Sequence, residues 1–401
     1  MVHETGISNY IAESIEKSSW IRKMFEEGTQ LKAIHGMENV FDFSLGNPSL
    51  HPPQAFETAL QDIVRKKESG AHAYMPNSGY PFVRKAVADR VSIERGTDIT
   101  PSDIVMTCGA AGGLNVVLKT LLNRGDEVLV PAPYFVEYGF YAENHGGVLK
   151  PVPTRDDFTL DIDAISAALT EKTRVFLINS PNNPTGQIYS RESIEQVGEL
   201  LKRKTKEFGR IIYLLSDEPY LKLVYDGLEV PDIFSVYDNS LVVMSYSKDL
   251  SIPGERIGYI AINPRAVHRK DLSDGLTLSN RILGFVSAPA LMQRVVGAIQ
   301  GTTVDIHAYA KKRERLCRGL LNAGYELVIP PGAFYAFPKA PIENEIEFVM
   351  ALREELILTV PGRGFGCPGY FRIAYCVSDD IIEGALPGFR RVMARYKQVQ
   401  P

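Results

Sequence analysis

Four short apolar runs recur through the middle of the chain and constrain its fold more than any other feature. They read EVLVPA, RVFLINS, IIYLLSDE and LVVMSYS, at residues 127–132, 174–180, 211–218 and 241–247. Each run is almost continuously apolar, which is typical of a strand buried on both faces of a parallel sheet. Between two of them, residues 190–209 are rich in Glu, Lys and Leu and have apolar residues at helical spacing. Alternating strands and helices predict an α/β fold with a parallel sheet.

The length of the chain predicts two packed units. Its 401 residues are more than one hydrophobic core usually organises. We expect three segments, namely an N-terminal arm that also joins the small unit, a large unit and a small C-terminal α+β unit, at 1–50, 51–290 and 291–401. A long helix over 290–325 is expected to lead into the small unit. RIAYCV at 372–377 predicts a strand there, followed by a helix from about residue 379.

Charge and composition exclude some classes of function. The formal net charge is −4, and Lys and Arg are scattered, so no nucleic-acid partner is expected. No apolar run approaches the roughly 20 residues that span a bilayer, so no membrane partner is expected. The N-terminus has neither the basic start nor the apolar stretch of a signal peptide. The four cysteines form no CxxC motif, which favours a reducing, cytoplasmic location.

Polar residues follow the apolar runs at the points where the predicted strands end. Asn183 comes after RVFLINS, Asp217 closes IIYLLSDE, and Lys248 follows LVVMSYS. In sheets of this kind, ligands bind beyond the carboxyl ends of the strands. The shared placement of these three residues therefore predicts one functional site.

The segment SYSKDLSIPGERIGY, at 245–259, suggests a phosphate site beside a lysine. An isolated Lys248 would most simply reach solvent, because burying an unpaired ammonium is costly. Here the hydroxyls of Ser245 and Ser247 precede it and Arg256 follows, and together they form a cradle for a phosphate. A lysine beside a phosphate ester suggests a phosphorylated aldehyde cofactor held as an imine.

CGAAGGLN, at 108–115, could supply the other side of that cradle. Small residues from Gly109 onward, ahead of a helical run, let backbone N–H groups approach an anion at a helix N-terminus. The simpler reading is a tight turn between a strand and a helix. For Asp217, the alternatives are a helix cap or an ion pair, or a place opposite the nitrogen of a pyridine ring. A carboxylate about 4 Å from that nitrogen contributes roughly 4 kcal/mol at an effective dielectric near 20.

Four more residues have both a structural and a functional interpretation. Asn183 and Tyr220 could donate hydrogen bonds to a phenolate oxygen or serve a turn. Phe135 could stack on a cofactor ring or belong to the core. Arg372 alternates with apolar residues on a predicted strand, where it needs either a structural ion pair or a substrate carboxylate.

Taken together and in this order, the motifs resemble the class I/II aminotransferases of fold type I, in the manner of aspartate aminotransferase. The motifs are SxSKxxxxPGxRxGY, NPTG, DEPY and FRIAY, and the resemblance runs from about residue 40 to residue 380. It implies a large domain with a mostly parallel seven-stranded sheet sandwiched by helices, together with a smaller α+β domain. It also implies pyridoxal 5'-phosphate as the cofactor and no metal.

The resemblance implies a role for each matching residue. Lys248 corresponds to the Schiff-base lysine and Asp217 to the partner of the pyridine nitrogen, while Asn183 and Tyr220 match the pair at the phenolate oxygen. The phosphate-side matches are Ser245, Ser247, Arg256 and the backbone N–H groups of Gly109, Ala110 and Ala111. Phe135 takes the place of the aromatic ring that stacks on the cofactor.

The substrate side is also implied by the resemblance. Arg372 matches the residue that binds the α-carboxylate, and Gly46 lines the same pocket. Tyr74 matches a tyrosine supplied by a neighbouring subunit, which implies a homodimer with shared active sites. Arg281 and Arg363 are two candidates for binding the distal carboxylate of aspartate.

The implied reaction moves an amino group from an L-amino acid, such as aspartate, to a 2-oxo acid, such as 2-oxoglutarate, by a ping-pong mechanism. Lys248 would act as the general base. Alternatives on the same fold are an aminocyclopropane-carboxylate synthase, a carbon–sulfur lyase, or an aminotransferase that prefers alanine or aromatic substrates. Two other classes of protein are not favoured. A transcription regulator with a module of this fold would need an added DNA-binding domain, for which the short, non-basic N-terminal segment leaves no room. A dinucleotide-binding oxidoreductase would need a GxGxxG motif, and none opens the first strand–helix unit.

Overall fold

The computed structural model describes residues 6–16 and 20–397, and its chain divides into two compact units. The large unit consists of Asn47–Lys311 and Pro330–Phe334, and the small unit of Met1–Gly46, Lys312–Ile329 and Tyr335–Pro401. The expected boundaries at 50 and 290 therefore differ from those observed. Residues after 290 stay in the large unit because helix α11 (Ala290–Ala298) packs on α3 (Gln54–Lys66) and α4 (Pro81–Arg95). Of the expected N-terminal arm, residues 1–5 and 17–19 lie outside the described residues.

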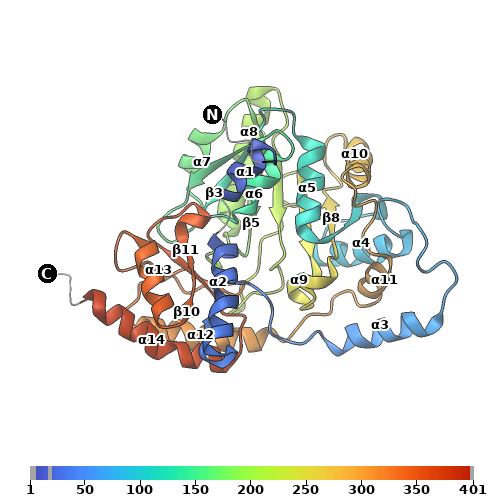
Figure 1. Cartoon of the computed structure of the whole chain (residues 1–401). Coiled ribbons are helices and arrows are strands. Elements are labelled where there is room, and N and C mark those ends of the chain that lie inside the picture. Colours follow the sequence, from blue (N-terminus) through green and yellow to red (C-terminus); the bar gives the residue numbers. More distant parts are fainter. Residues whose placement is uncertain (1–5, 17–19, 398–401) are drawn as a thin grey trace. The chain divides into compact units, whose positions relative to one another are not determined.

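A seven-stranded sheet forms the centre of the large unit (Figure 1). In spatial order its strands are β2 (Ile104–Thr107), β8 (Gly258–Ile262), β7 (Ser240–Ser245), β6 (Tyr213–Asp217), β5 (Thr173–Asn179), β3 (Glu127–Ala132) and β4 (Val148–Pro153). β8 runs antiparallel to both of its neighbours, and every other pairing is parallel. The mostly parallel sheet that the apolar runs predict is confirmed.

Helices cover both faces of this sheet. One face carries α4, α7 (Ile162–Ala168), α8 (Arg191–Phe208) and α11, and the other carries α5 (Gly109–Leu121), α6 (Glu137–Glu143) and α10 (Arg269–Ile282). Along β5, Phe176 and Ile178 pack into the first core, while Val175 and Leu177 pack into the second. Because successive side chains of a strand point to opposite faces, a strand covered on both sides must be apolar at every position.

The ends of two segments differ from the prediction for identifiable reasons. The run 241–247 ends as a strand at Ser245, because the Ser245 hydroxyl caps the short helix α9 (Tyr246–Asp249) by accepting a hydrogen bond from the Ser247 N–H. The expected continuous helix over 290–325 is two helices, α11 and α12 (Ile306–Ala323). Between them Gly301 adopts a positive φ of 85°, which an α-helix does not accommodate.

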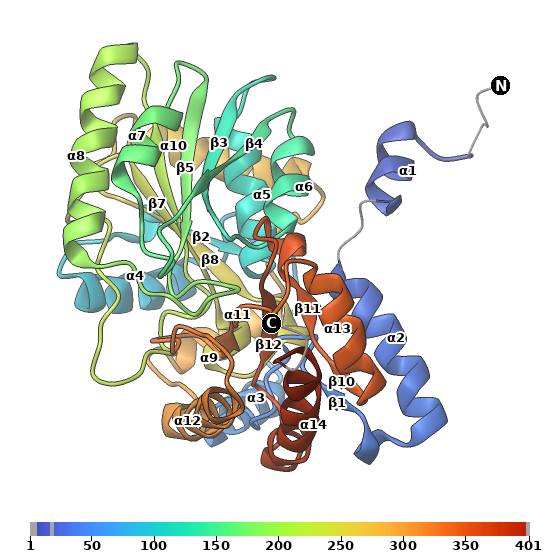
Figure 2. The ribbon, with the colours of Figure 1, turned by 90° about the vertical axis from the view of Figure 1, so that its left-hand side faces the viewer.

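The small unit is an α+β structure, as expected (Figure 2). Its helices are α1 (Asn9–Glu16), α2 (Trp20–His35), the last part of α12, α13 (Glu345–Glu354) and α14 (Asp379–Lys397). β1 (Phe41–Asp42) pairs with β10 (Ile357–Leu358), and β12 (Phe371–Ala374) lies between β11 (Val360–Pro361) and β9 (Tyr335–Ala336). The pairing of β1 with β10 attaches the N-terminal segment to the C-terminal part of the chain.

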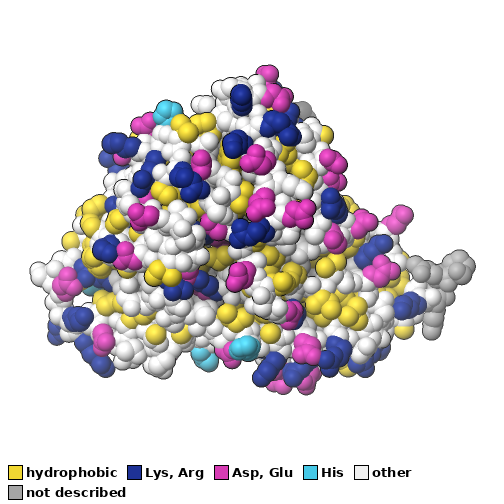
Figure 3. All heavy atoms as spheres, turned by 180° about the vertical axis from the view of Figure 1, so that it is seen from behind, with side chains coloured by type: hydrophobic (Ala, Val, Ile, Leu, Met, Phe, Trp, Pro, Cys, Tyr) yellow, Lys and Arg dark blue, Asp and Glu magenta, His cyan; other side chains and the backbone are white. Residues whose placement is uncertain are grey.

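The distribution of charged side chains on the surface matches the scattered Lys and Arg of the sequence. On the face seen in Figure 3, basic and acidic side chains are interspersed, and the basic ones form no continuous area. Among the described helices, none is long and apolar enough to cross a membrane.

A buried ion pair holds the C-terminal turn of α4 against the residue that follows β6. Arg95 pairs through Nη2 with Glu218 and through Nη1 with Asp232, the latter at 2.8 Å. The Arg95 and Glu218 side chains are only 7% and 1% exposed. Burial raises the pKa of Glu218, and the Arg95 guanidinium opposes that rise. The pair therefore fixes the position of the segment directly after Asp217.

We expect Arg95→Met to lower the free energy of unfolding by about 3–5 kcal/mol, because it leaves the Glu218 carboxylate buried without a cation. Urea unfolding measures the change. The double variant Arg95→Met/Glu218→Gln should recover much of the loss. As a control, Arg191→Ala breaks an exposed ion pair with Glu195 and should cost at most about 0.5 kcal/mol. Equal losses for Arg95→Met and Arg191→Ala would contradict the assignment.

Candidate functional site

Three adjacent parallel strands end at the candidate site. β5 ends at Asn179, β6 at Asp217 and β7 at Ser245, and the pairing sets Asn179 beside Asp217. The Asn179 amide donates a hydrogen bond to the Asp217 carbonyl at 2.8 Å, and its side-chain oxygen accepts one from the Asn183 N–H at 2.7 Å. Asn179 thus joins the Asp217 and Asn183 backbones. The sequence alone did not indicate a role for Asn179, because it stands at the end of the apolar run 174–180 and is read simply as part of the strand.

Asp217 is a buried carboxylate with one unsatisfied oxygen. Its Oδ2 accepts a hydrogen bond from the Tyr138 hydroxyl at 2.7 Å, and its Oδ1 has no hydrogen-bond partner among the described residues. Burial raises the pKa of Asp217 to about 7; the Tyr138 hydrogen bond opposes this rise and the nearby Glu218 adds to it. Such a carboxyl suits a cationic N–H donor at Oδ1. Tyr138 was not anticipated, although it lies three residues after Phe135 in PAPYFVEY.

Lys248 lies in α9, a four-residue helix that follows β7 directly. Its Nζ is 5.7 Å from the centre of the Phe334 ring. The buried Tyr220 ring meets Phe334 edge-on, with centroids 5.5 Å apart. Phe334 thus lies close to both predicted residues, although it is far from them in sequence. Its segment, Pro330–Phe334, belongs to the large unit while the residues on either side belong to the small unit.

The N-terminus of α5 and Arg256 form an anion cradle. Gly109 has a φ of +70°, and a Cβ built there would lie 2.8 Å from Arg256 Nη2, so only glycine allows this approach. Arg256 Nη1 donates to the Ser247 hydroxyl at 3.5 Å, and the Ser245 hydroxyl donates to Ser247 Oγ at 2.8 Å.

The backbone of α5 completes this cradle. Ala110 and Ala111 lie in the first turn of α5, where backbone N–H groups have no acceptor within the helix. A helix N-terminus also carries partial positive charge. The predicted phosphate-side residues therefore lie next to one another.

Two other predicted residues of the large unit have different surroundings. Phe135, in the loop before α6, packs edge-on against Tyr138 with ring centroids 5.6 Å apart. Tyr74 is 95% exposed, so within this chain it lines no enclosed site.

The small unit holds Arg372 and Gly46 in one cluster. Arg372 is 2% exposed, and its guanidinium lies 4.8 Å from the centres of both the Tyr335 and Phe365 rings. Its Nη2 donates to the Ser44 carbonyl at 2.6 Å. At Gly46 a Cβ would lie 2.1 Å from the Tyr335 hydroxyl oxygen, so any larger residue would displace the Tyr335 ring. Aromatic rings on two sides orient the guanidinium plane.

The two arginines considered for a distal carboxylate differ in their partners. Arg363 Nε donates to Glu345 Oε1 at 2.8 Å, and its Nη2 donates to Glu345 Oε2 at 3.3 Å. The Glu345 side chain is fully buried, and hydrogen bonding to Arg363 helps to lower its pKa. Arg281, near the end of α10, is exposed, and its side chain makes no hydrogen bond or ion pair with any described residue.

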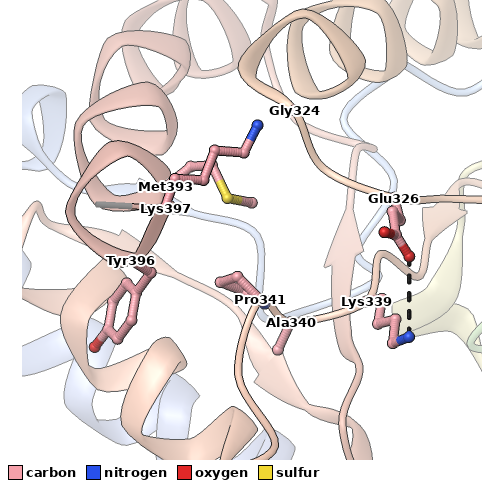
Figure 4. A pocket seen from close by; sticks show the side chains of 8 residues that line it. All are labelled: Gly324, Glu326, Lys339, Ala340, Pro341, Met393, Tyr396 and Lys397. Carbon is pink, nitrogen blue, oxygen red and sulfur yellow. Dashed lines mark ion pairs between the residues drawn. The ribbon is translucent and has the colours of Figure 1, made fainter. Parts of the chain in front are cut away.

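A pocket of about 210 Å³ in the small unit contains none of the predicted residues (Figure 4). Its lining includes Lys339 and Glu326, which form an ion pair at 3.9 Å, and Tyr396 and Lys397 from the end of α14. These side chains offer no buried polar group, and the pocket is not part of the candidate site.

A stability measurement can test the state of Asp217. In the unfolded chain it ionises near its ordinary pKa of 3.8, whereas in the folded protein its pKa is about 7. Because the folded state holds the proton more tightly, the contribution of Asp217 to stability is greatest below about pH 4 and is lost as the pH rises to about 7. Asp217→Asn mimics the protonated form and escapes this loss. Its gain over the wild type should grow from near zero at pH 4 to about 2–4 kcal/mol at pH 8.

Urea unfolding of the ligand-free protein across this pH range measures the gain. The exposed Asp163→Asn variant is the control for removing a carboxylate from the surface. A gain for Asp217→Asn that does not change with pH would contradict the raised pKa.

Sequence comparison identifies the family of this chain. Residues 38–387 match the family model described as aminotransferase class I and II. A probable aspartate/prephenate aminotransferase from Thermus aquaticus is 32% identical over 357 residues, which cover 87% of this chain and 90% of that protein.

Solved structures agree with this match and with the expected fold type I. An amino transferase from Eubacterium rectale has a TM-score of 0.94 and 39% identity, and the match covers 97% of this chain and 99% of that one. The aspartate aminotransferase from Thermus thermophilus with maleate has a TM-score of 0.83 and 27% identity, covering 94% of this chain and 97% of that one. The chain therefore belongs to the class I and II aminotransferase family, and it is an aminotransferase.

Proposed function

We propose that this enzyme binds pyridoxal 5'-phosphate in the large unit. The observation that carries the proposal is the Asp217 carboxylate, which is buried with Oδ1 lacking a hydrogen-bond partner among the described residues. A protonated pyridine nitrogen is a cationic N–H donor that would satisfy this oxygen. The cradle of α5, Ser247 and Arg256 fits a phosphate dianion, because helix N–H groups and a guanidinium both favour negative charge.

Each remaining residue of the large-unit site has a place in this proposal. Phe135 would contact the face of the ring, while Asn183 and Tyr220 would donate hydrogen bonds to its phenolate oxygen. Lys248 would hold the cofactor covalently through Nζ. Asn179 donates a hydrogen bond to the Asp217 carbonyl and accepts one from the Asn183 N–H. These two bonds would hold the residue at the ring nitrogen and the residue at the phenolate oxygen in fixed positions relative to each other.

The cofactor supplies an aldehyde carbon that carries the amino group and a ring that accepts electrons. The protein supplies proton transfer and orientation. The Lys248 amine, once released, would take the α-proton of the bound amino acid at Nζ and return it on the cofactor side. Asp217 would keep the ring protonated, since a carboxylate stabilises a nearby cation in a buried site.

We propose an L-amino acid with a second carboxylate, such as aspartate, as the donor and a 2-oxo acid such as 2-oxoglutarate as the acceptor. The similar proteins named above include an aspartate aminotransferase with maleate, which is a dicarboxylate. Arg372, oriented by Tyr335 and Phe365, would bind the α-carboxylate through two N–H groups. Arg281 is the better candidate for the distal carboxylate, because Arg363 already pairs with Glu345.

We further propose a homodimer in which each subunit contributes to the site of the other. Tyr74, at 95% exposure, is available to reach a neighbouring subunit and contact its phosphate. A cytoplasmic location accompanies this proposal, because none of the four cysteines forms a disulfide bond, as is usual in a reducing compartment.

A spectral titration tests the function. Adding aspartate to the purified protein loaded with pyridoxal 5'-phosphate should remove the visible absorbance band of the cofactor, and adding 2-oxoglutarate should restore it. Lys248→Ala should stay folded and lose at least about 10²-fold in turnover, because a general base typically contributes 10²–10⁴-fold. Amino-acid consumption without loss of the band would indicate a lyase. Near-normal transamination by Lys248→Ala would overturn the assignment.

Paired variants test the dicarboxylate preference. Arg281→Ala should lower kcat/KM for aspartate about tenfold or more and leave kcat/KM for alanine and phenylalanine within about twofold, because only aspartate has the carboxylate that it would bind. Arg363→Ala is the matched control; it breaks the pair with Glu345 and should affect all three donors alike. Uniform effects of Arg281→Ala on the three donors would exclude its role.

A further inference from the structure

Glu345, the first residue of α13, is a fully buried acid of the small unit that takes no part in the proposed reaction. Its Oε1 accepts hydrogen bonds from Arg363 Nε at 2.8 Å and from the Arg363 N–H at 3.2 Å. Its Oε2 accepts hydrogen bonds from Arg363 Nη2 at 3.3 Å and from the Gly369 N–H at 3.2 Å. A carboxylate is costly to bury unless it is paired and hydrogen-bonded. These four donors meet that cost, and they come from two points of one loop.

This loop, residues 362–370, connects β11 to β12. At its base the Gly362 N–H donates a hydrogen bond to the Tyr370 carbonyl at 2.7 Å. Arg372 lies in β12, two residues after Tyr370. Glu345 therefore holds, near both of its ends, the loop that leads into the strand bearing the predicted carboxylate-binding arginine.

Phe365 is the residue by which the 362–370 loop contacts Arg372. Its side chain is fully buried, and its ring centre lies 4.8 Å from the guanidinium carbon. Phe337 packs edge-on against the same ring, with centroids 6.1 Å apart. A guanidinium is attracted to the face of an aromatic ring, so the ring influences the direction in which Arg372 presents its N–H groups. Glu345 binds the loop two residues before Phe365 and four residues after it.

We propose that Glu345 is a positioning residue for the substrate α-carboxylate: it holds the 362–370 loop at two points and thereby keeps Phe365 against the Arg372 guanidinium. The proposal rests on the proposed function, in which Arg372 binds that carboxylate through two N–H groups. Binding through two N–H groups depends on the orientation of the guanidinium plane. A misaligned cation–π contact in a buried site should weaken carboxylate binding about 3- to 30-fold. The loss should be alike for all L-amino acids, because each has an α-carboxylate.

Glu347 provides a matched control, because it is an exposed acid in the first turn of the same helix. Glu345→Gln and Glu347→Gln each neutralise one carboxylate of α13, but only Glu345→Gln weakens the hold on the 362–370 loop. Glutamine is nearly isosteric with glutamate, and its NH₂ group cannot accept the hydrogen bonds that one carboxylate oxygen accepts. A chemical control is hydroxylamine, which reacts with the cofactor aldehyde and has no carboxylate for Arg372 to bind.

The first experiment mixes holoenzyme loaded with pyridoxal 5'-phosphate with aspartate, alanine or hydroxylamine and follows the loss of the visible absorbance band. Glu345→Gln should raise the half-saturating concentration of both amino acids about 3- to 30-fold, with the maximal rate within about threefold. Its rate with hydroxylamine, and all rates of Glu347→Gln, should stay within about twofold of the wild type. An equal loss with hydroxylamine, or no change with either amino acid, would overturn the proposal. Failure of the wild type to lose its band with hydroxylamine would instead refute the proposed function.

A double-mutant cycle tests whether Glu345 acts through Phe365. Phe365→Leu removes the ring and should by itself raise the half-saturating aspartate concentration about 3- to 30-fold. In Glu345→Gln/Phe365→Leu the increase should stay within about twofold of that for Phe365→Leu alone, because the contact that Glu345 maintains is already absent. Increases that multiply in the double variant would show independent effects and overturn the proposal.

Trp20, the single tryptophan of the chain, supplies a readout that requires no cofactor. It packs beside Gly364 in the 362–370 loop, where an added Cβ would lie 3.5 Å from Trp20 Cβ. Acrylamide quenching of the fluorescence of the ligand-free protein should increase in Glu345→Gln and in Arg363→Ala, and Glu347→Gln should match the wild type. Arg363→Ala removes two of the donors to Glu345 and keeps the test decisive where Glu345→Gln does not fold. Unchanged quenching in Glu345→Gln or, in its place, Arg363→Ala would overturn the proposal.

Discussion

Burial of the Asp217 carboxylate is the constraint on which much of the large unit depends. The end of β6 is covered on both sides, so the charged form of this group is disfavoured and its pKa lies near 7. The Tyr138 hydroxyl and the Asn179 amide each satisfy one oxygen of the residue. One carboxylate oxygen is left for a ligand. The site therefore favours a cationic partner even before a ligand binds. Electrostatic stabilisation is pre-organised in this way.

At two glycines, a side chain from elsewhere in the chain approaches the backbone closely. Gly109 lets Arg256 reach the start of α5, and Gly46 lets the Tyr335 hydroxyl approach the backbone beside the Arg372 cluster. In each case a methyl group would collide with a polar side-chain atom, Nη2 of Arg256 at Gly109 and the hydroxyl oxygen of Tyr335 at Gly46. Gly109 is also favoured by its positive φ of 70°, whereas at Gly46 the close approach alone favours glycine.

Several parts of the fold and site were predictable because local pattern determines them. The continuous apolar runs identified buried parallel strands, and the strand ends identified Asp217 and Lys248 as neighbours of one edge. Other parts were not. The break after α11 depends on a single glycine conformation, and the unit boundary depends on how α11 packs against α3 and α4. Neither leaves a clear mark on apolar periodicity, which reports burial and not the identity of the covering element.

The sequence by itself determined the order of strands and helices, the cofactor-side motifs and the family. Only the tertiary structure decided which distant groups complete them: Tyr138 on Asp217, Phe334 beside Lys248, Glu345 on Arg363 and Arg95 on Glu218. The physical reason is the range of the interactions. Periodicity, capping and turn chemistry act over a few residues, whereas hydrogen bonds and ion pairs between buried groups join residues far apart in the chain, and their partners are set by packing.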